Sequence, residues 1–223
     1  MDSASLQRVW AALLPHHVVV RVGGYSTSAL PGGASEAIAA ATMQDSRRLE
    51  FLSGRLYARK ALQALGHRGS ADIPVAGDRG PLWPEGVVGS ITHTLGGTGG
   101  WAAAAVCEVA RFGSLGIDME CRDNFDASAL EVVLTPTERA ALKSAPPALR
   151  SHSAGLIWCA KEAVIKAARG TTDPGDIEIA LSKSSVQFRA TLRSDAPEAQ
   201  GRERVFEGRA SYEDGFAFAA AYR

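Results

Sequence analysis

The sequence has few cysteines, no excess charge of either sign and no long apolar segment. Its three cysteines (Cys107, Cys121 and Cys159) form no C-x-x-C pair, which suits a reduced, cytosolic compartment. The 24 basic and 24 acidic residues cancel, so the chain lacks the positive charge of a nucleic-acid-binding protein. The apolar stretch 101–106 is too short to cross a membrane, and the N-terminus has no basic segment followed by apolar residues. We therefore expect a cytoplasmic protein that binds neither nucleic acid nor a membrane.

What is present is the composition of a folded protein. Apolar residues make up 46% and charged residues 22% of 223, enough for one large core or two small ones. The balanced charge is unevenly distributed: residues 47–79 contain seven Arg and Lys against three acids, whereas residues 117–138 contain six acids against Arg122 alone. This separation suits a half that holds anions and a half that holds a cation, and solvated helix faces are the alternative explanation.

The pattern of residues predicts helices in three places. Residues 34–65 are rich in Ala, Leu, Arg and Glu, and Gly66 follows them as a natural helix end. The T-P-T-E sequence at 135–138 has the spacing of a capping box, with proline at the first helical position. Residues 152–168 form the clearest helix, and Gly170 closes it.

Strands are predicted where β-branched or alternating apolar residues occur, at 18–22, 101–108, 114–118, 186–192 and 216–222. The second and third of these are expected to be neighbours joined by a short turn around Gly113. Residues 69–90 lack helical periodicity and read as a long loop. The order helix, strands, helix, strands predicts an α+β fold.

Two carboxylates stand at strand spacing in the G-I-D-M-E sequence of residues 116–120. Because residues i and i+2 of a strand point to the same face, Asp118 and Glu120 would lie side by side. Two negative charges at so short a separation repel each other unless a cation lies between them. Oxygen ligands of this kind suit Mg²⁺. A strand that emerges into solvent with both acids exposed is the alternative.

A second candidate site is the K-E-A-V-I-K sequence of residues 161–166, in which Glu162 and Lys166 lie one helical turn apart. A surface ion pair worth about 0.3 kcal/mol would explain this spacing. Alternatively, Glu162 is a metal ligand or general base, and Lys166, with Lys161, lies over a phosphate.

Basic residues of the N-terminal half could bind an anion. Arg47 and Arg55 are eight positions apart, about 2.2 helical turns, so they share a side of the helix and could clamp a phosphate. A solvated basic stripe would look the same. His93, flanked by hydroxyl residues, could donate to an anion or be structural. A nucleophilic pair of Cys159 with a histidine is disfavoured, because Cys159 lies in an apolar helix stretch.

Four motifs follow one another along the chain: R-R-x-E-F-x-x-G-R at 47–55, W-P-x-G-V-x-G-S-x-T-H at 83–93, G-I-D-x-E at 116–120 and K-E-A-x-x-K at 161–166. This set resembles the 4′-phosphopantetheinyl transferases of the larger Sfp type, in their siderophore-synthesis and mycobacterial branch. The resemblance implies a pseudo-dimer of two similar α+β subdomains. Residues 1–113 would hold the phosphates of coenzyme A, and residues 114–223 would carry the metal site and the catalytic helix.

The resemblance also implies roles for individual residues. The ligands of Mg²⁺, with Mn²⁺ as an alternative, would be Asp118, Glu120 and Glu162. Glu162 would also be the base for the acceptor serine, directly or through water. Lys161 and Lys166 would face the diphosphate. The 3′-phosphate of coenzyme A and its neighbouring groups would contact Arg47, Arg55, Ser90, Thr92 and His93.

One position departs from the family pattern. Family members often carry a lysine a few residues before the W-P motif, where this chain has Ala76 with Arg79 slightly beyond it. Arg79 is therefore the candidate replacement for that lysine.

The implied activity is transfer of the 4′-phosphopantetheine group of coenzyme A to a serine of an apo acyl or peptidyl carrier protein, with release of 3′,5′-ADP by a monomeric enzyme. Two alternatives stay open: a coenzyme A-binding or carrier-binding module without catalysis, and a Mg²⁺-dependent phosphohydrolase of nucleotides. Carrier proteins tend to be acidic, and residues 122–130 are the candidate docking segment.

Overall fold

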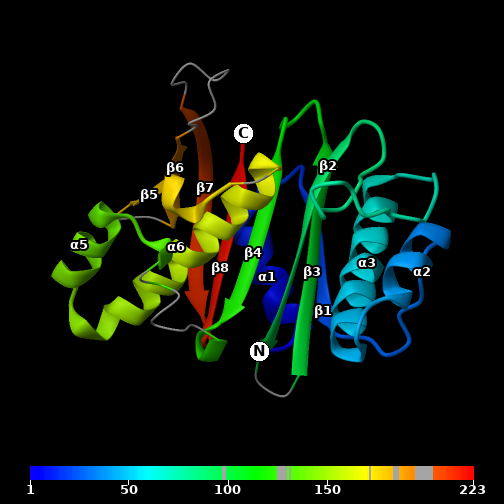
Figure 1. The fold of residues 1–223 in the computed structure, drawn as a ribbon, viewed down its shortest axis with the longest axis horizontal. Coiled ribbons are helices and arrows are strands. Elements are labelled where there is room, and N and C mark those ends of the chain that lie inside the picture. The colour runs from blue at the N-terminus through cyan, green and yellow to red at the C-terminus, as the bar shows by residue number, and fades with distance from the viewer. Residues whose placement is uncertain (97–98, 125–129, 131, 171, 183–185, 194–202) are drawn as a thin grey trace. The chain divides into compact units, whose positions relative to one another are not determined.

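The computed structural model describes residues 1–223 except 97–98, 125–129, 131, 171, 183–185 and 194–202 (Figure 1). The chain divides into two compact units, Met1–Leu115 and Gly116–Arg223, close to the boundary expected at residue 113. Each unit packs helices against a β-sheet, so the predicted α+β class is confirmed. Within the described ranges, no helix is long and apolar enough to cross a membrane.

The first unit is built around an antiparallel sheet in the order β1-β3-β2. Its strands are β1 (Val19–Gly24), β2 (Val87–Gly96) and β3 (Gly99–Glu108), and its helices are α1 (Ser3–Leu13), α2 (Ala34–Ala41) and α3 (Asp45–Leu65). Helix α3 lies along the sheet, with α2 beside it (Figure 1). The core between α3 and β3 is made largely of small residues, among them Ala58, Ala61 and Ala104, which lets helix and sheet approach closely.

The single helix predicted over residues 34–65 is wrong, because the structure has two helices there, α2 and α3. Thr42 ends α2: its hydroxyl donates to the carbonyl of Ala39, which competes with continuation of the helix. The predicted end of α3 is confirmed. Gly66 adopts the left-handed conformation, with φ of 95°, that glycine reaches without a steric penalty.

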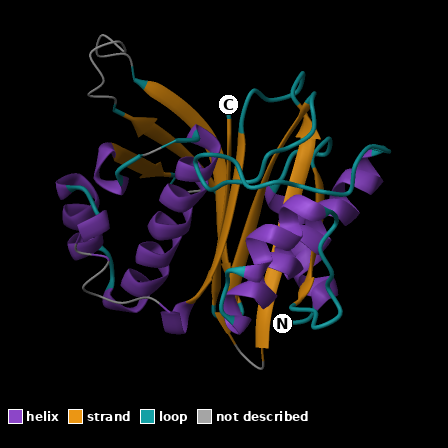
Figure 2. Cartoon of the chain, turned by 45° about the vertical axis from the view of Figure 1, so that its right-hand side comes forward, coloured by secondary structure: helices purple, strands orange, loops and turns teal. Residues whose placement is uncertain are grey.

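The second unit has a five-stranded sheet in the order β4-β8-β7-β6-β5. Its strands are β4 (Leu115–Cys121), β5 (Ile177–Leu181), β6 (Gln187–Leu192), β7 (Arg204–Glu213) and β8 (Phe216–Tyr222). Its helical elements are η1 (Arg122–Asn124), α5 (Pro136–Ser144), α6 (Pro147–Ala168) and η2 (Pro174–Asp176). Figure 2 shows α6 lying along this sheet, with α5 next to it.

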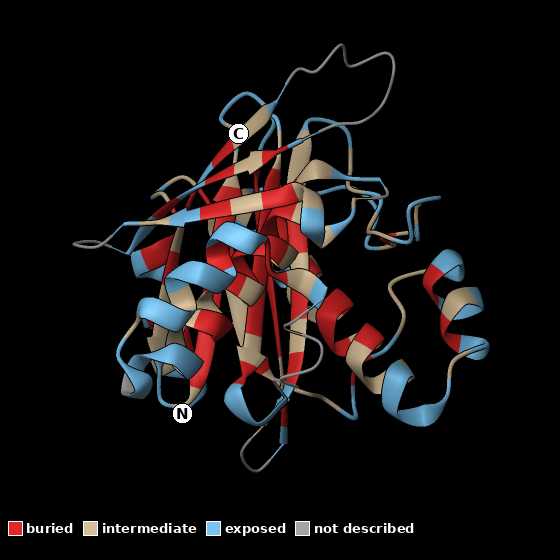
Figure 3. Ribbon diagram, turned by 60° about the vertical axis from the view of Figure 1, so that its left-hand side comes forward, coloured by how far each residue is buried: buried red, intermediate tan, exposed pale blue. Residues whose placement is uncertain are grey.

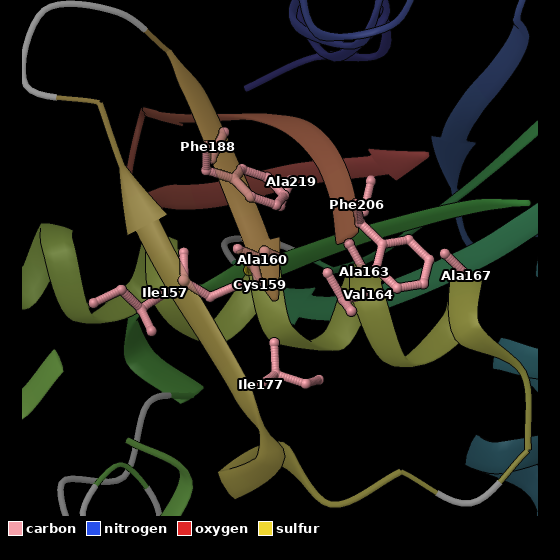
Figure 4. Packing of buried hydrophobic residues seen from close by; sticks show 14 of the residues in the cluster. Ile157, Cys159, Ala160, Ala163, Val164, Ala167, Ile177, Phe188, Phe206 and Ala219 are labelled. Atoms are coloured by element: carbon pink, nitrogen blue, oxygen red, sulfur yellow. The ribbon is translucent and has the colours of Figure 1, made fainter. Parts of the chain in front are cut away.

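Helix α6 supplies one side of the second unit's core. Cys159, Ala160, Ala163 and Val164 are fully buried against the sheet, where Phe188 and other strand residues cover them (Figure 4). Buried residues are concentrated in the strands and in the helix segments that pack on them (Figure 3). The predicted capping box at the start of α5 is confirmed, and α6 begins at Pro147, earlier than predicted.

The strands predicted around Gly113 both exist, but they are not neighbours. Strand β3 has β1 on one edge and β2 on the other, so neither edge can accept β4, which enters the other sheet. The loop predicted over residues 69–90 ends earlier than expected, because β2 begins at Val87. Strands β2, β5 and β7 were not predicted.

Candidate functional site

The acid pair of residues 116–120 lies on β4, as its spacing predicts. Asp118 is buried, with 6% of its surface exposed, whereas Glu120 is half-buried. Glu120 Oε1 accepts hydrogen bonds from the Cys121 backbone N at 2.9 Å and from Asn124 Nδ2 at 2.6 Å. The alternative of two fully exposed acids is therefore wrong.

Helix α6 crosses the start of β4 at backbone contact distance. A Cβ placed on Gly116 would lie 1.8 Å from the carbonyl O of Ala163 and 2.8 Å from the backbone N of Ala167. Only a residue without a side chain fits here, which explains the glycine that begins the motif. This close approach brings the α6 residues Glu162 and Lys166 next to the acids of β4.

Lys166 makes the clearest contact between the two elements. Its Nζ donates to Asp118 Oδ1 at 2.7 Å and to the carbonyl O of Ile117 at 3.2 Å. The ammonium is partly exposed, with 29% of the side chain accessible, against 9% for Asp118. Lys166 is thus a cation held at the edge of a buried carboxylate, where a bound anion could also reach it.

The electrostatics of Glu162 reflect its burial and two neighbouring carboxylates. Burial raises the pKa of Glu162, the negative charges of Asp118 and Glu120 raise it further, and Lys166 partly opposes them. Such mutual repulsion is relieved when a cation binds. Carboxylate oxygens are the donors that Mg²⁺ prefers, so these residues fit that ion chemically.

The described residues contain no three His, Cys, Asp or Glu side chains gathered closely enough to hold a metal ion by themselves. Mg²⁺ does not require such a cage, because it commonly takes one or two protein carboxylates together with substrate phosphates and water. The acids of β4 and α6 therefore form a partial donor set.

Lys161 is not placed with this group, and the prediction that it faces a diphosphate is wrong. The residue is fully buried, and its Nζ lies 2.8 Å from Glu138 Oε2. The same ammonium donates to the carbonyl oxygens of Val133 and Pro174 at 2.7 and 2.9 Å. Burial lowers the pKa of Lys161, and Glu138 counteracts this effect. Lys161 therefore joins α6 to α5 and to the segment before β5.

The first unit brings together Arg47 of α3 and His93 of β2, with Glu50 beside them. Arg47 Nη1 lies 3.0 Å from Glu50 Oε2 and 2.8 Å from His93 Nε2. The Arg47 side chain is 53% exposed, so its guanidinium remains accessible to an anion.

Arg55 occupies the interior of the first unit instead of the surface beside Arg47. Its Nε donates to the carbonyl O of Ile73 at 3.0 Å, and its guanidinium lies over the Phe51 ring, 4.7 Å from the centroid. Burial lowers the pKa of Arg55 to about 10, and the nearby charge of Arg47 contributes to this lowering. Arg55 stays cationic at neutral pH, but it is not part of a solvated stripe.

Ser90 and Thr92 are buried in β2, with 3% and 1% of their surfaces exposed. Side chains alternate between the two faces of a strand. Ile91 lies over Gly54 of α3, so His93 shares the α3 face of the sheet, whereas Ser90 and Thr92 lie on the opposite face. The role of these two hydroxyls in binding coenzyme A therefore stays a prediction.

The other two predicted features are Arg79 and the docking segment 122–130. Arg79 is exposed in a tight turn, with φ of 64°, in which its backbone N donates to the carbonyl O of Ala76. The candidate docking segment 122–130 lies mostly outside the described residues, which include only 122–124 and Leu130.

The sequence analysis assigned no role to Glu36, which is fully buried. Its carboxylate accepts from the backbone N of Gly32 at 2.8 Å and of Ile73 at 2.9 Å, and from Arg59 Nη1 at 2.6 Å. It thereby fixes the segment whose Ile73 carbonyl holds Arg55. A single acid in an alanine-rich helix gives no sequence signal for such a role.

The buried position of Lys161 leads to a test against the exposed Lys143 of α5. Lys161→Met should destabilise the protein by about 3–5 kcal/mol, because it leaves the buried Glu138 carboxylate unpaired. Lys143→Met should change stability by no more than about 0.5 kcal/mol. Urea unfolding measures both. A Lys161→Met protein as stable as the control, but with weakened coenzyme A binding, would restore the original assignment.

In a comparison with known protein families, two families match this chain. The 4′-phosphopantetheinyl transferase N-terminal domain matches residues 34–107, and the 4′-phosphopantetheinyl transferase superfamily matches residues 114–219. The first range contains the cluster around Arg47, and the second contains the acids of β4 and α6.

Three curated relatives are similar to this chain. It is 44% identical over 127 residues to 4′-phosphopantetheinyl transferase Npt of Nocardia iowensis, covering 55% of this chain and 52% of Npt. It is 37% identical over 180 residues to Svp of Streptomyces mobaraensis, covering 77% and 70% of the two chains. It is 39% identical over 126 residues to PptT of Mycobacterium tuberculosis, covering 54% and 51%. The chain therefore spans about half the length of Npt and PptT.

Proposed function

Because the chain belongs to the 4′-phosphopantetheinyl transferase family, we propose that it transfers the 4′-phosphopantetheine group of coenzyme A to a serine of an apo acyl or peptidyl carrier protein. 3′,5′-ADP is the other product. The observation that carries this proposal is the meeting of β4 and α6, where Lys166 Nζ lies 2.7 Å from Asp118 Oδ1 and two more carboxylates act on the same region.

The acids of the second unit have the chemistry to hold Mg²⁺, or Mn²⁺ in its place, through Asp118, Glu120 and Glu162. When bound, this ion supplies positive charge that neutralises the diphosphate of coenzyme A. Lys166 contributes a second cation at the same edge, because its partly exposed ammonium can donate to a phosphate oxygen as well as to Asp118.

Glu162 is the proposed general base. A serine hydroxyl attacks phosphorus poorly until its proton is removed, and a carboxylate held beside it can take that proton. The serine oxygen forms a bond to the β-phosphorus of the diphosphate while the bond from that phosphorus to the bridging oxygen breaks. The proton passes to Glu162, directly or through one water, and leaves to solvent.

The basic residues of the first unit are proposed to hold the 3′-phosphate of coenzyme A. Arg47 and His93 lie together with the arginine exposed, and Arg55 adds positive charge from the interior. Arg79, exposed in its turn, is the proposed replacement for the family lysine.

We further propose that the protein works in the cytoplasm as a monomer. None of its three cysteines forms a disulfide, which suits a reducing compartment. Two α+β units within one chain support a monomer, and the balanced charge speaks against nucleic acid as a partner.

The test is incubation of the purified protein with coenzyme A, MgCl₂ and a panel of apo carrier proteins, followed by intact mass measurement. We expect a carrier to gain the mass of one phosphopantetheine group, and EDTA to prevent the gain. Binding of coenzyme A with no mass gain on any carrier would favour a non-catalytic module. Release of nucleotide without a carrier would indicate a phosphohydrolase.

A further inference from the structure

Glu50 stands at the centre of three charged or titratable side chains in the first unit, which we call the Arg47–Glu50–His93 cluster. Its Oε2 accepts a hydrogen bond from Arg47 Nη1 at 3.0 Å and lies 3.8 Å from His93 Nδ1. Arg47 Nη1 is also 2.8 Å from His93 Nε2. One carboxylate is thus within ion-pair distance of both residues proposed to hold a phosphate.

The chemistry of arginine fixes the arrangement of protons in this cluster. A guanidinium has only donors, so His93 Nε2 must accept from Arg47 Nη1. The imidazole proton is then on Nδ1, the ring nitrogen that lies nearer to Glu50. Glu50 therefore faces one donor from Arg47 and one from His93. Its negative charge favours this orientation of the guanidinium and of the imidazole.

Within the described residues, both contacts of the Arg47 guanidinium use the single nitrogen Nη1. The edge formed by Nε and Nη2 remains for an incoming anion, and the side chain is 53% exposed. Two N–H groups on one edge are the geometry that binds phosphate in a bidentate manner. Glu50 thus anchors one corner of the guanidinium and leaves its phosphate-binding edge open.

A neighbouring ion pair on the same helix is an ordinary surface contact and differs from the Arg47–Glu50 pair in its exposure. Arg48 pairs with Asp45, also three residues away, but the Asp45 side chain is 93% exposed. The Glu50 side chain is only 18% exposed, and it faces His93 of β2 across from α3. Packing therefore fixes the position of the Glu50 side chain. A residue that orients its neighbours needs such a fixed position.

We propose that Glu50 is a positioning residue, which holds Arg47 and His93 in the geometry that recognises the 3′-phosphate of coenzyme A. This role rests on the function proposed above. An arginine that is already oriented loses less rotational freedom when the phosphate binds. Glu50 thereby increases discrimination between coenzyme A and 3′-dephospho-coenzyme A. The interaction that matters is the hydrogen-bond acceptor that Glu50 offers to Arg47 Nη1.

The test compares dissociation constants of coenzyme A and 3′-dephospho-coenzyme A by titration calorimetry. Glu50→Ala should reduce the ratio between the two constants by about tenfold, through loss of coenzyme A affinity alone. Glu50→Gln, whose amide oxygen still accepts from Arg47, should keep the ratio within about threefold of the unchanged protein. Asp45→Ala, which disrupts the exposed pair, is the matched control and should leave the ratio unchanged.

Arg47→Ala separates the two proposals. If it collapses the ratio while Glu50→Ala does not, the positioning role is wrong and the proposed phosphate site stands. If neither variant alters the ratio, the 3′-phosphate is bound elsewhere and both proposals for this cluster are overturned. A Glu50→Ala protein that loses affinity for both ligands equally would show a structural effect and would also contradict the positioning role.

Discussion

Glu162→Gln is expected to slow carrier modification by a factor of about 10² to 10⁴, while the protein melts at or above the temperature of the unchanged chain. The rate falls because the amide cannot take the serine proton and is a weaker metal ligand. Stability is retained because the substitution removes a half-buried charge that repels Asp118 and Glu120. Intact mass kinetics and thermal melting measure the two effects.

The matched control for this variant is Glu207→Gln, which removes an exposed carboxylate of β7, 4.0 Å from Arg189. It should leave both the rate and the melting temperature nearly unchanged. A Glu162→Gln protein that modifies carrier as fast as this control would exclude Glu162 as the base and as an essential metal ligand.

Gly116→Ala is the second change from which we expect a large effect. The added methyl group would lie 1.8 Å from the Ala163 carbonyl O, so α6 must move away from β4. Forcing an extra methyl into a packed interior costs about 1–3 kcal/mol, and a backbone clash belongs at the upper end of that range. Because the helix carries Glu162 and Lys166, we expect a loss of activity of about a hundredfold as well, the effect of misplacing such groups by about 1 Å.

Gly77→Ala is the control for the glycine substitution, because a Cβ at that position has no atom within 4 Å. Urea unfolding and carrier modification should both resemble those of the unchanged protein. Equal stability and equal activity of the Gly116 and Gly77 variants would show that contact between β4 and α6 does not fix the proposed catalytic residues Glu162 and Lys166.

Spacing along single elements was the most informative feature of the sequence. The strand of Asp118, the helix of Glu162 and the left-handed end at Gly66 each follow from local rules of periodicity and capping. The relation between neighbouring strands was not predictable in this way. Whether β4 pairs with β3 depends on which edges β1 and β2 already occupy, and that is decided by contacts far apart in the chain.

Charged residues show the same limit. Lys161 and Lys166 stand in one motif, yet the first is fully buried against Glu138 and the second lies at the edge of Asp118. A lysine that belongs to a motif can therefore serve the core as well as the site, and only its position around the helix axis decides. The role of Glu50 likewise depends on His93, 43 residues further along the chain.

Helix α5 is attached to its unit in an unusual way: of its nine residues Glu138 alone is buried, and Leu142 is half-buried. The helix is held at its first turn by one carboxylate that meets Lys161 and the backbone N of Ile179. Almost all of the outward surface of α5 therefore makes no packing contact with the rest of the unit. Substitutions on that surface would leave α6 undisturbed, so we expect α5 to vary between relatives more than the elements behind it.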